Sequence, residues 1–374
     1  TVLSYLLTYR KSLLIADQKE YIASITGLIL NVVSYLAIIL LVTWEQNYLL
    51  ALGIGTVTEV VLNIWISWYV EQKYPFLRQR RKEKSTSSLT KRIVRDLKSL
   101  FISRISEKML YCTDNLIISG FIGVGTVGRY ANYCMITQAI SNILTILANT
   151  IQPTVGDYFT EKNRQRNYEI LRQLTFGFFC IASVVSVGLF SLITPFVRDI
   201  WLGPSYELGW GITVFCIVVL LVRIMGLPLS LVMGVTGLFE KEKNVGASSA
   251  LLNLIVSLAL VKPYGMAGVL LGTLLSYLLQ ILYRYIIYFR DFLEMPGEAL
   301  RYAQDIGEYL AVIAGEVLLM QKIVPLIYGA GGMLLFCVCF LLCIAIPLLL
   351  DLVIFGRGWR LQSIVTMVKG MRKA

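Results

Sequence analysis

Long runs of apolar residues, separated by short polar stretches, occupy most of this chain. A helix that crosses the hydrocarbon core of a bilayer needs about 20 mostly apolar residues. By this criterion the pattern predicts an all-α, polytopic membrane protein with ten membrane-spanning helices. The predicted spans are residues 22–43, 48–70, 100–122, 130–155, 173–197, 208–237, 245–261, 265–289, 303–322 and 328–355.

Composition agrees with this pattern and removes several classes of function. Hydrophobic residues make up 57% of the 374 residues and charged residues 15%, whereas soluble domains carry about 25% charged residues. Without any histidine, the chain cannot build a His-based catalytic triad or most kinds of zinc site. The seven cysteines lie in apolar stretches and form no CxxC motif, so we interpret them as core residues. We therefore expect neither an enzyme nor a bound cofactor or metal.

The basic residues indicate how the chain is oriented. The net charge is +11. If the first segment is cytoplasmic, 27 of the 34 basic residues fall in inside segments and only four in outside loops. This asymmetry predicts a multi-pass protein of the cytoplasmic membrane with both ends in the cytoplasm. It also accounts for the charge without a nucleic-acid partner, and it places the basic loop 71–99 against anionic lipid headgroups.

An internal repeat suggests how the spans are grouped. Two places share a polar Lys-Glu turn, an Asn twelve residues later and a Gly-Thr pair in the next span. The two sets are Lys19-Glu20, Asn31 and Gly55-Thr56, and Lys241-Glu242, Asn253 and Gly272-Thr273. Parallel repeats of this kind build transporters from two helical bundles. We therefore predict the end of a first lobe over 1–70, a basic linker over 71–99, a second six-helix lobe over 100–290, and two additional helices with a basic tail over 291–374.

The predicted span 100–122 carries unusual charge. Arg104 and Lys108 lie one helical turn apart, so they share a face. They either bind an anionic substrate or are neutralised by Glu107, which lies between them. For Asp114 in the same span we expect a hydrogen bond to a neighbouring helix, and it is also a candidate coupling group.

Arg223 is the most isolated charge in the sequence. It lies in the middle of the predicted span 208–237, and no acidic residue lies within one turn of it along the chain. A charge at this depth is expensive and commonly marks a substrate or ion pathway. The alternative is an ion pair with a distant carboxylate such as Glu59 or Glu316, which are themselves mid-span candidates for ion coupling.

Three glycine patterns have structural interpretations. The motif GxGxxG at 123–128 lies between two spans, so we predict a tight external turn there rather than a nucleotide site. Small residues also recur every fourth position, which lets helices approach closely. The two sets are Gly226, Ser230 and Gly234, and Gly268, Gly272 and Ser276.

Several segments resemble those of polysaccharide flippases. They are SLLIADQKEY at 12–21, DNLIISGFIG at 114–123 followed by VGRY at 127–130, and GLFEK at 237–241 followed by YGMAGV at 264–269 and GT at 272–273. In their order and spacing these segments are similar to the oligosaccharide flippase branch of the multidrug, oligosaccharidyl-lipid and polysaccharide exporter superfamily. The resemblance implies two six-helix lobes around a central cavity, with the ten spans as helices five to fourteen. Because the chain begins at Thr1, we expect that four preceding helices are missing and that this chain alone does not transport.

The resemblance further implies the substrate, an undecaprenyl-diphosphate-linked oligosaccharide that moves from the inner to the outer leaflet. Arg223, Arg104 and Lys108 suit its anionic headgroup, because arginine binds phosphate through two hydrogen bonds and lysine adds a point charge. Expected partners are this lipid-linked substrate, membrane lipids, a coupling ion of unknown identity and proteins of polysaccharide assembly. The main alternative is a cation-coupled multidrug exporter of the same superfamily, whose cavity should be acidic and aromatic. A membrane enzyme or a structural scaffold fits the sequence less well.

Overall fold

The structure, a computed structural model, describes residues 11–17, 19–45, 48–75, 112–159, 163–236, 238–329 and 331–356. In these ranges every regular element is a helix and none is a strand. The predicted all-α class is therefore confirmed. The chain divides into two compact units, Thr1–Thr90 and Lys91–Ala374.

The first unit contains a short helix and a pair of long ones. Their bounds are α2 Lys11–Ala16, α3 Glu20–Glu45 and α4 Tyr48–Lys73. Leu14, Ala23, Ile66 and Val70 form a small core where α2 meets the ends of α3 and α4. At this end the phenol of Tyr74 donates a hydrogen bond of 2.6 Å to Asp17 Oδ2, so the end of α4 is tied to the turn after α2. Hydrogen bonds from Lys19 and Tyr74 lower the pKa of the Asp17 carboxyl.

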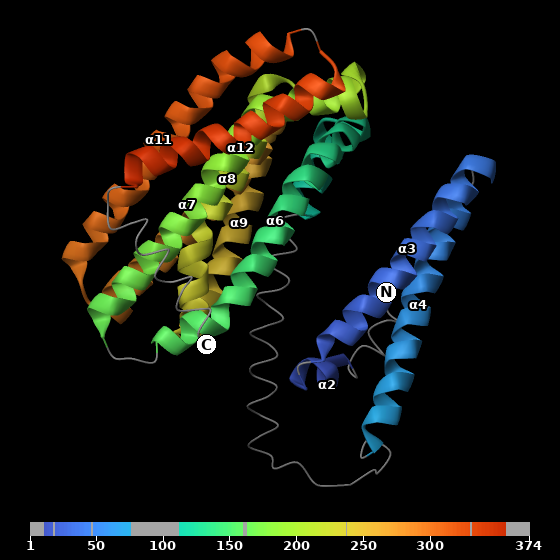
Figure 1. The fold of residues 1–374 in the computed structure, drawn as a ribbon, viewed down its shortest axis with the longest axis horizontal. Coiled ribbons are helices and arrows are strands. Elements are labelled where there is room, and N and C mark those ends of the chain that lie inside the picture. The colour runs from blue at the N-terminus through green and yellow to red at the C-terminus, as the bar shows by residue number, and fades with distance from the viewer. Residues whose placement is uncertain are drawn as a thin grey trace. The chain divides into compact units, whose positions relative to one another are not determined.

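The second unit holds the larger bundle (Figure 1). Residues 112–121 are helical. The elements that follow are α6 Val124–Phe159, α7 Arg164–Pro195, the π-helical turn η2 Phe196–Trp201, the 3₁₀ turn η3 Pro204–Tyr206, α8 Trp210–Val235, α9 Phe239–Tyr264, α10 Met266–Ile287, the π-helical turn η4 Tyr288–Leu293, α11 Pro296–Tyr328 and α12 Met333–Phe355. α8 packs against α6, α7 and α10, while α11 and α12 both pack on α7.

Nine helices among the described residues are long and apolar enough to cross a membrane. They coincide with nine of the ten predicted spans, with ends that differ by several residues. The tenth, predicted at 100–122, lies outside the described residues up to 111, and its described part is helical. Helix α11 includes Asp305, Glu308 and Glu316, so the span most diluted by acidic residues is nevertheless a continuous helix.

The predicted turn over 123–128 is shorter than expected. Only Gly123 has a backbone that favours glycine, with φ of +126°, and α6 begins at the next residue. Gly125 and Gly128 lie inside the first turns of α6, so the prediction is wrong for 124–128. The sequence misled because a helix of 36 residues is much longer than a bilayer requires, and it takes up the residues that we had assigned to the turn.

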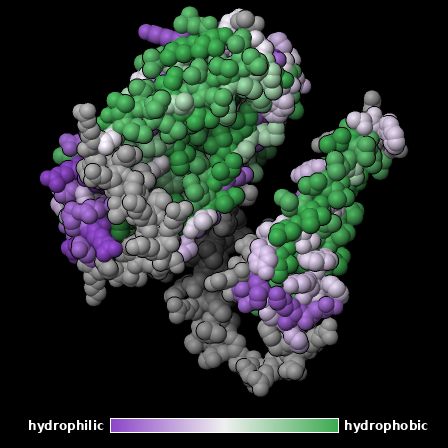
Figure 2. Space-filling model, viewed as in Figure 1, coloured by the Kyte–Doolittle hydropathy of each residue, from purple (hydrophilic) through white to green (hydrophobic). Residues whose placement is uncertain are grey.

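Apolar side chains cover the sides of the helices, and hydrophilic ones gather toward helix ends (Figure 2). On α3, for example, Leu28, Val33 and Leu40 are all exposed. Exposed apolar surface on this scale is unfavourable in water and is what lipid tails cover. The two units therefore both have the surface of a membrane-embedded protein.

Ion pairing fixes α11 against α7 in the second unit. Arg172 on α7 donates from Nε to Asp305 Oδ2 at 2.6 Å and from Nη2 to Oδ1 at 2.9 Å. One turn away, Thr175 and Tyr302 share a buried hydrogen bond of 3.0 Å. A two-pronged pair of this kind sets the register of two helices as well as their contact. The predicted boundary at 290 lies just before α11, and the separation of 291–374 as additional helices stays a prediction.

Candidate functional site

Three polar side chains from three helices meet inside the second unit. Thr273 on α10 donates a hydrogen bond of 2.6 Å to Asp114 Oδ2 in the helical segment 112–121. Asn253 on α9 donates from Nδ2 to Asp114 Oδ1 at 3.3 Å and to Thr273 Oγ1 at 3.0 Å. All three residues are buried. The expected bond from Asp114 to a neighbouring helix is present, and it reaches two helices.

Close packing of α9 on α10 makes this meeting possible. A Cβ atom on Gly268 would collide with the backbone carbonyl of Leu260, and one on Gly272 would collide with the hydroxyl of Ser257. Ser276 also donates a hydrogen bond of 2.9 Å to the carbonyl of Ser249 across the same contact. The small-residue pattern therefore predicted a close helix contact correctly.

The other set of small residues, Gly226, Ser230 and Gly234, lies on α8. A Cβ on Gly226 would lie 2.9 Å from a side-chain carbon of Ile281 on α10, and one on Gly234 would lie 2.9 Å from Gln152 on α6. Both glycines thus bring α8 close to its neighbours. Contact at this distance leaves no room for a larger residue unless the neighbouring side chain moves.

Replacing Gly268 with alanine is expected to loosen the contact between α9 and α10. Because the new methyl group meets backbone rather than a flexible side chain, we expect a loss of about 1–3 kcal/mol in the free energy of unfolding. Thermal unfolding of the purified protein in detergent measures this effect. The matched control is Gly177→Ala on α7, where nothing lies within 4 Å of the added atom. Equal melting temperatures for the two variants would contradict the prediction.

A small cavity of about 70 Å³ adjoins this polar cluster. Its wall includes Asp114 and Thr273, Gln138 and Ser141 on α6, and Arg223 on α8. The structure therefore brings together Arg223 and Asp114, which are 109 positions apart in the sequence. A cavity of this size holds a few water molecules. It is a polar chamber inside the bundle, bordered by one cationic and one anionic side chain.

The other sequence candidates lie elsewhere. Arg104 and Lys108 lie outside the described residues. Glu59 lies in the first unit, on an exposed face of α4. Glu316 on α11 is buried and accepts a hydrogen bond of 2.6 Å from Ser183 on α7, so it belongs to a contact between α7 and α11.

A second carboxyl group accompanies Glu316. Asp351 on α12 is also buried, close enough to Glu316 for their charges to interact. Neither Asp351 oxygen accepts a hydrogen bond from the residues that the structure describes, and the same holds for Glu316 Oε1. Our sequence reasoning did not single out Asp351, although it is the only acidic residue in the 23-residue helix α12.

Asn253 and Thr273 were also missed as site residues. The signal was present, because both belong to the second copy of the internal repeat. The first copy also forms two consecutive helices, α3 and α4, but Asn31 and Thr56 are exposed there. Only the second copy places its Asn and Thr beside a buried carboxylate.

The fold defines a class of protein, a multi-span helical membrane protein. Comparison with known proteins shows what this chain resembles. Residues 1–159 match the family described as polysaccharide biosynthesis protein. Among solved structures, the chain is similar to lipid II flippase MurJ in an inward closed conformation, with a TM-score of 0.64 and 16% identity over 94% of this chain and 71% of that chain. No curated protein matches the chain significantly.

These two findings agree with the resemblance drawn from the sequence: residues 1–159 match a polysaccharide biosynthesis family, and the fold is similar to that of a lipid flippase. At 16% identity, the solved structure carries the argument for the fold alone.

Proposed function

We propose that this protein is a flippase for undecaprenyl-diphosphate-linked oligosaccharide repeat units, a transporter and not an enzyme. It moves them from the inner to the outer leaflet of the cytoplasmic membrane for surface polysaccharide synthesis. The observation that carries the proposal is the polar chamber in a membrane-embedded bundle, where Arg223 and Asp114 share one wall. An arginine at this depth is a recognition group for phosphate, because its guanidinium presents a planar pair of donors.

Arg223 takes the role of diphosphate contact in this proposal. Charge-assisted hydrogen bonds to phosphate are about twice as strong as neutral ones, and the low dielectric of the bundle strengthens them further. Arg104 and Lys108 are proposed as additional phosphate contacts on the strength of their spacing in the sequence. None of these side chains touches the sugar in the proposal, so a protein built this way can accept different glycans on a common lipid carrier.

Asp114 takes the role of coupling group. Its carboxylate, the hydroxyl of Thr273 and the Oδ1 atom of Asn253 are oxygen ligands of the kind that hard cations prefer. Asn253 Oδ1 is buried and accepts no hydrogen bond from the described part of the chain, so this oxygen is available to coordinate a cation. The cluster can hold a proton or a small cation and ties that binding to three helices. Glu59 and Glu316 remain alternative coupling groups.

The experiment that tests the function is transport by the full-length protein in proteoliposomes. The substrate is a fluorescent undecaprenyl-diphosphate oligosaccharide placed in both leaflets, with a membrane-impermeant quencher outside. Fluorescence from the inner leaflet is initially protected from the quencher. We expect this protected fluorescence to be lost in liposomes that contain the flippase and to persist in empty liposomes. Efflux of a cationic dye without movement of the lipid-linked oligosaccharide would instead identify a multidrug exporter and overturn the proposal.

Orientation is part of the same proposal. With both ends cytoplasmic, residues 71–99 are cytoplasmic and Lys262 is external, at the end of α9. On a cysteine-free background, Lys262→Cys is expected to react with an impermeant maleimide in intact cells, and Lys82→Cys is expected not to. The reverse labelling pattern would contradict this topology. We further propose that proteins of polysaccharide assembly and anionic membrane lipids are its partners.

A further inference from the structure

A second cavity of about 730 Å³ lies between the end of α7 with η2, the start of α8 and the end of α11. By the proposed topology this is the outer side of the membrane. Pockets for small organic ligands have volumes of about 300–1,000 Å³, so the cavity is large enough for sugar rings. None of the residues that we assigned to substrate or coupling contributes to its wall.

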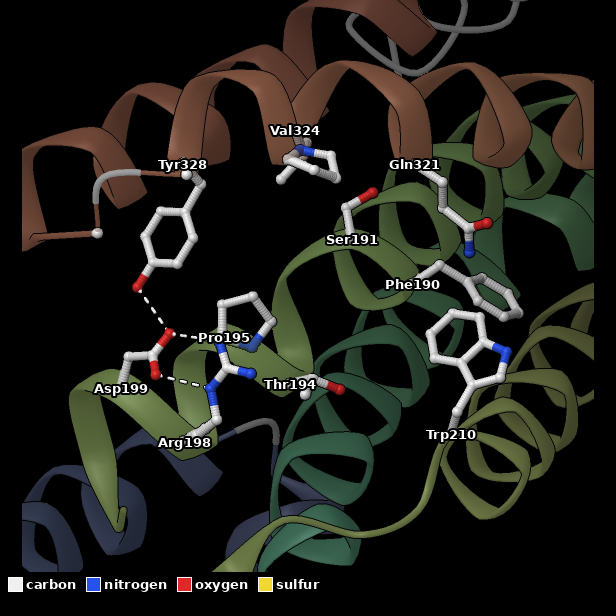
Figure 3. Close-up of a pocket in the computed structure, with 13 residues that line it drawn as sticks. Phe190, Ser191, Thr194, Pro195, Arg198, Asp199, Trp210, Gln321, Val324 and Tyr328 are labelled. Carbon is white, nitrogen blue, oxygen red and sulfur yellow. Dashed lines mark hydrogen bonds and ion pairs between the residues drawn. The ribbon is translucent and has the colours of Figure 1, made fainter. Parts of the chain in front are cut away.

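One end of the cavity is ionic but electrically neutral (Figure 3). Arg198 donates from Nε to Asp199 Oδ1 at 2.7 Å and from Nη2 to Oδ2 at 3.1 Å. The phenol of Tyr328 donates a further hydrogen bond of 3.1 Å to Asp199 Oδ2. The arginine is thus matched to a carboxylate from the same turn. A neutral pair offers donors and acceptors to hydroxyl groups, and it has much less attraction for a phosphate than a lone arginine has.

The other end is aromatic. Trp210 at the start of α8 is 54% exposed, and its ring centroid lies 6.3 Å from that of Phe190 on α7. Figure 3 places Gln321 of α11 beside these two rings. An exposed indole supported by a second ring gives a flat apolar face with low entropic cost. The C–H face of a pyranose ring packs on such a surface, while a nearby amide supplies both a donor and an acceptor.

Hydroxyl groups lie between the two ends. Ser191 and Thr194 of α7 both line the cavity. The hydroxyl oxygen of Ser191 is itself buried. The cavity therefore combines a stacking face, a neutral ion pair and two hydroxyl-bearing side chains.

We propose that this cavity is a binding site for uncharged sugar residues, which holds part of the glycan on the outer side after the lipid headgroup has crossed. The identification of the sugar as part of the transported glycan rests on the proposed function. The binding of sugar by this cavity does not. A phospholipid headgroup is the competing occupant. It would require net positive charge in the cavity wall, and the pairing of Arg198 with Asp199 removes that charge.

The test measures binding to the full-length protein in nanodiscs by saturation-transfer NMR. The probes are lacto-N-tetraose, chitotetraose and maltotetraose, with glycerol 3-phosphate as the headgroup probe. We expect millimolar or tighter binding of at least one tetrasaccharide. Trp210→Ala and Gln321→Ala should each weaken it at least tenfold, and Trp210→Phe should retain most of it. Trp44→Ala, which removes an exposed indole from α3 in the other unit, is the matched control and should bind normally.

Several results would overturn the inference. These are no binding of any tetrasaccharide, binding that is indifferent to Trp210→Ala and Gln321→Ala, or preferential binding of glycerol 3-phosphate. Melting curves of the two alanine variants exclude unfolding as the cause of lost binding. Transport is measured on the same samples, so the two proposals fail separately. If sugar does not bind but flipping is normal, only the proposal of a sugar site is overturned. If sugar binds normally but no flipping occurs, only the proposed function is overturned.

Discussion

Replacing Arg223 with alanine is expected to abolish export of the glycan while the protein accumulates at normal levels. The guanidinium lines the polar chamber from α8. Under the proposed function, its loss leaves the substrate phosphate without a cationic partner in a low dielectric. Removing one partner of a buried charge pair costs about 3–5 kcal/mol, which corresponds to a loss of more than 100-fold in binding. Arg223→Lys keeps the charge and loses the planar pair of donors, so we expect it to retain a minor part of the activity.

Complementation of a flippase-deficient strain measures the effect, together with accumulation of lipid-linked oligosaccharide on the inner leaflet. The control is Arg301→Ala, which removes an arginine from an exposed pair with Glu298 on α11. That variant is expected to export normally, because exposed pairs contribute little. Full export by Arg223→Ala would end the assignment of Arg223 to the diphosphate and would leave the fold untouched.

Replacing Asp114 with asparagine is expected to uncouple transport. Asparagine has nearly the same shape, and its Oδ1 can still accept the hydrogen bond from Thr273. Its amide nitrogen can donate to Asn253 Oδ1 if the Asn253 amide turns over, so the meeting of the three helices should survive. It cannot take up a proton, and it offers a cation no negative charge. We therefore expect flipping to fall at least tenfold and to lose its response to an imposed ion gradient, with a melting temperature close to that of the parent protein.

Glu316→Gln provides the matched comparison, because Glu316 is also a buried carboxyl residue with one hydroxyl donor, Ser183. Flipping by both variants is measured in proteoliposomes under a proton gradient and, separately, under a sodium gradient. If the gradient still drives Asp114→Asn and fails to drive Glu316→Gln, then the coupling group is Glu316. Asp114→Ala is a less clean test, since it leaves the donor of Asn253 without its acceptor in a buried place.

The sequence was sufficient for the features that depend on local composition. Apolar runs located nine of the described spans, because the thickness of the bilayer imposes a length that any spanning helix must satisfy. Small residues every fourth position predicted the contact made by Gly268 and Gly272, because only a helix contact explains that spacing in an apolar span. The helix bond of Asp114 followed from the cost of a lone charge in hydrocarbon.

The partners of these residues could not be predicted. Asn253 and Thr273 lie 139 and 159 positions from Asp114, and no periodic pattern links residues at that separation. For the same reason the cavity beside Arg198 and Asp199 could not be predicted from the sequence. Arg198 fell between two predicted spans and Trp210 at the start of the second, and nothing in the sequence indicated that both face α11. Such sites depend on which helices become neighbours, and that is decided by packing over the whole bundle.

The glycine contact between α9 and α10 also has a mechanical consequence. Because α9 and α10 approach so closely at Gly268 and Gly272, one helix cannot slide along the other without a clash, and we expect the two to move together. The segment 112–121 is fastened to this pair of helices by the two hydrogen bonds of Asp114, which neutralisation of the carboxylate would weaken. If this unit moves during a transport cycle, the strength with which segment 112–121 is attached to α9 and α10 would then depend on the charge of Asp114.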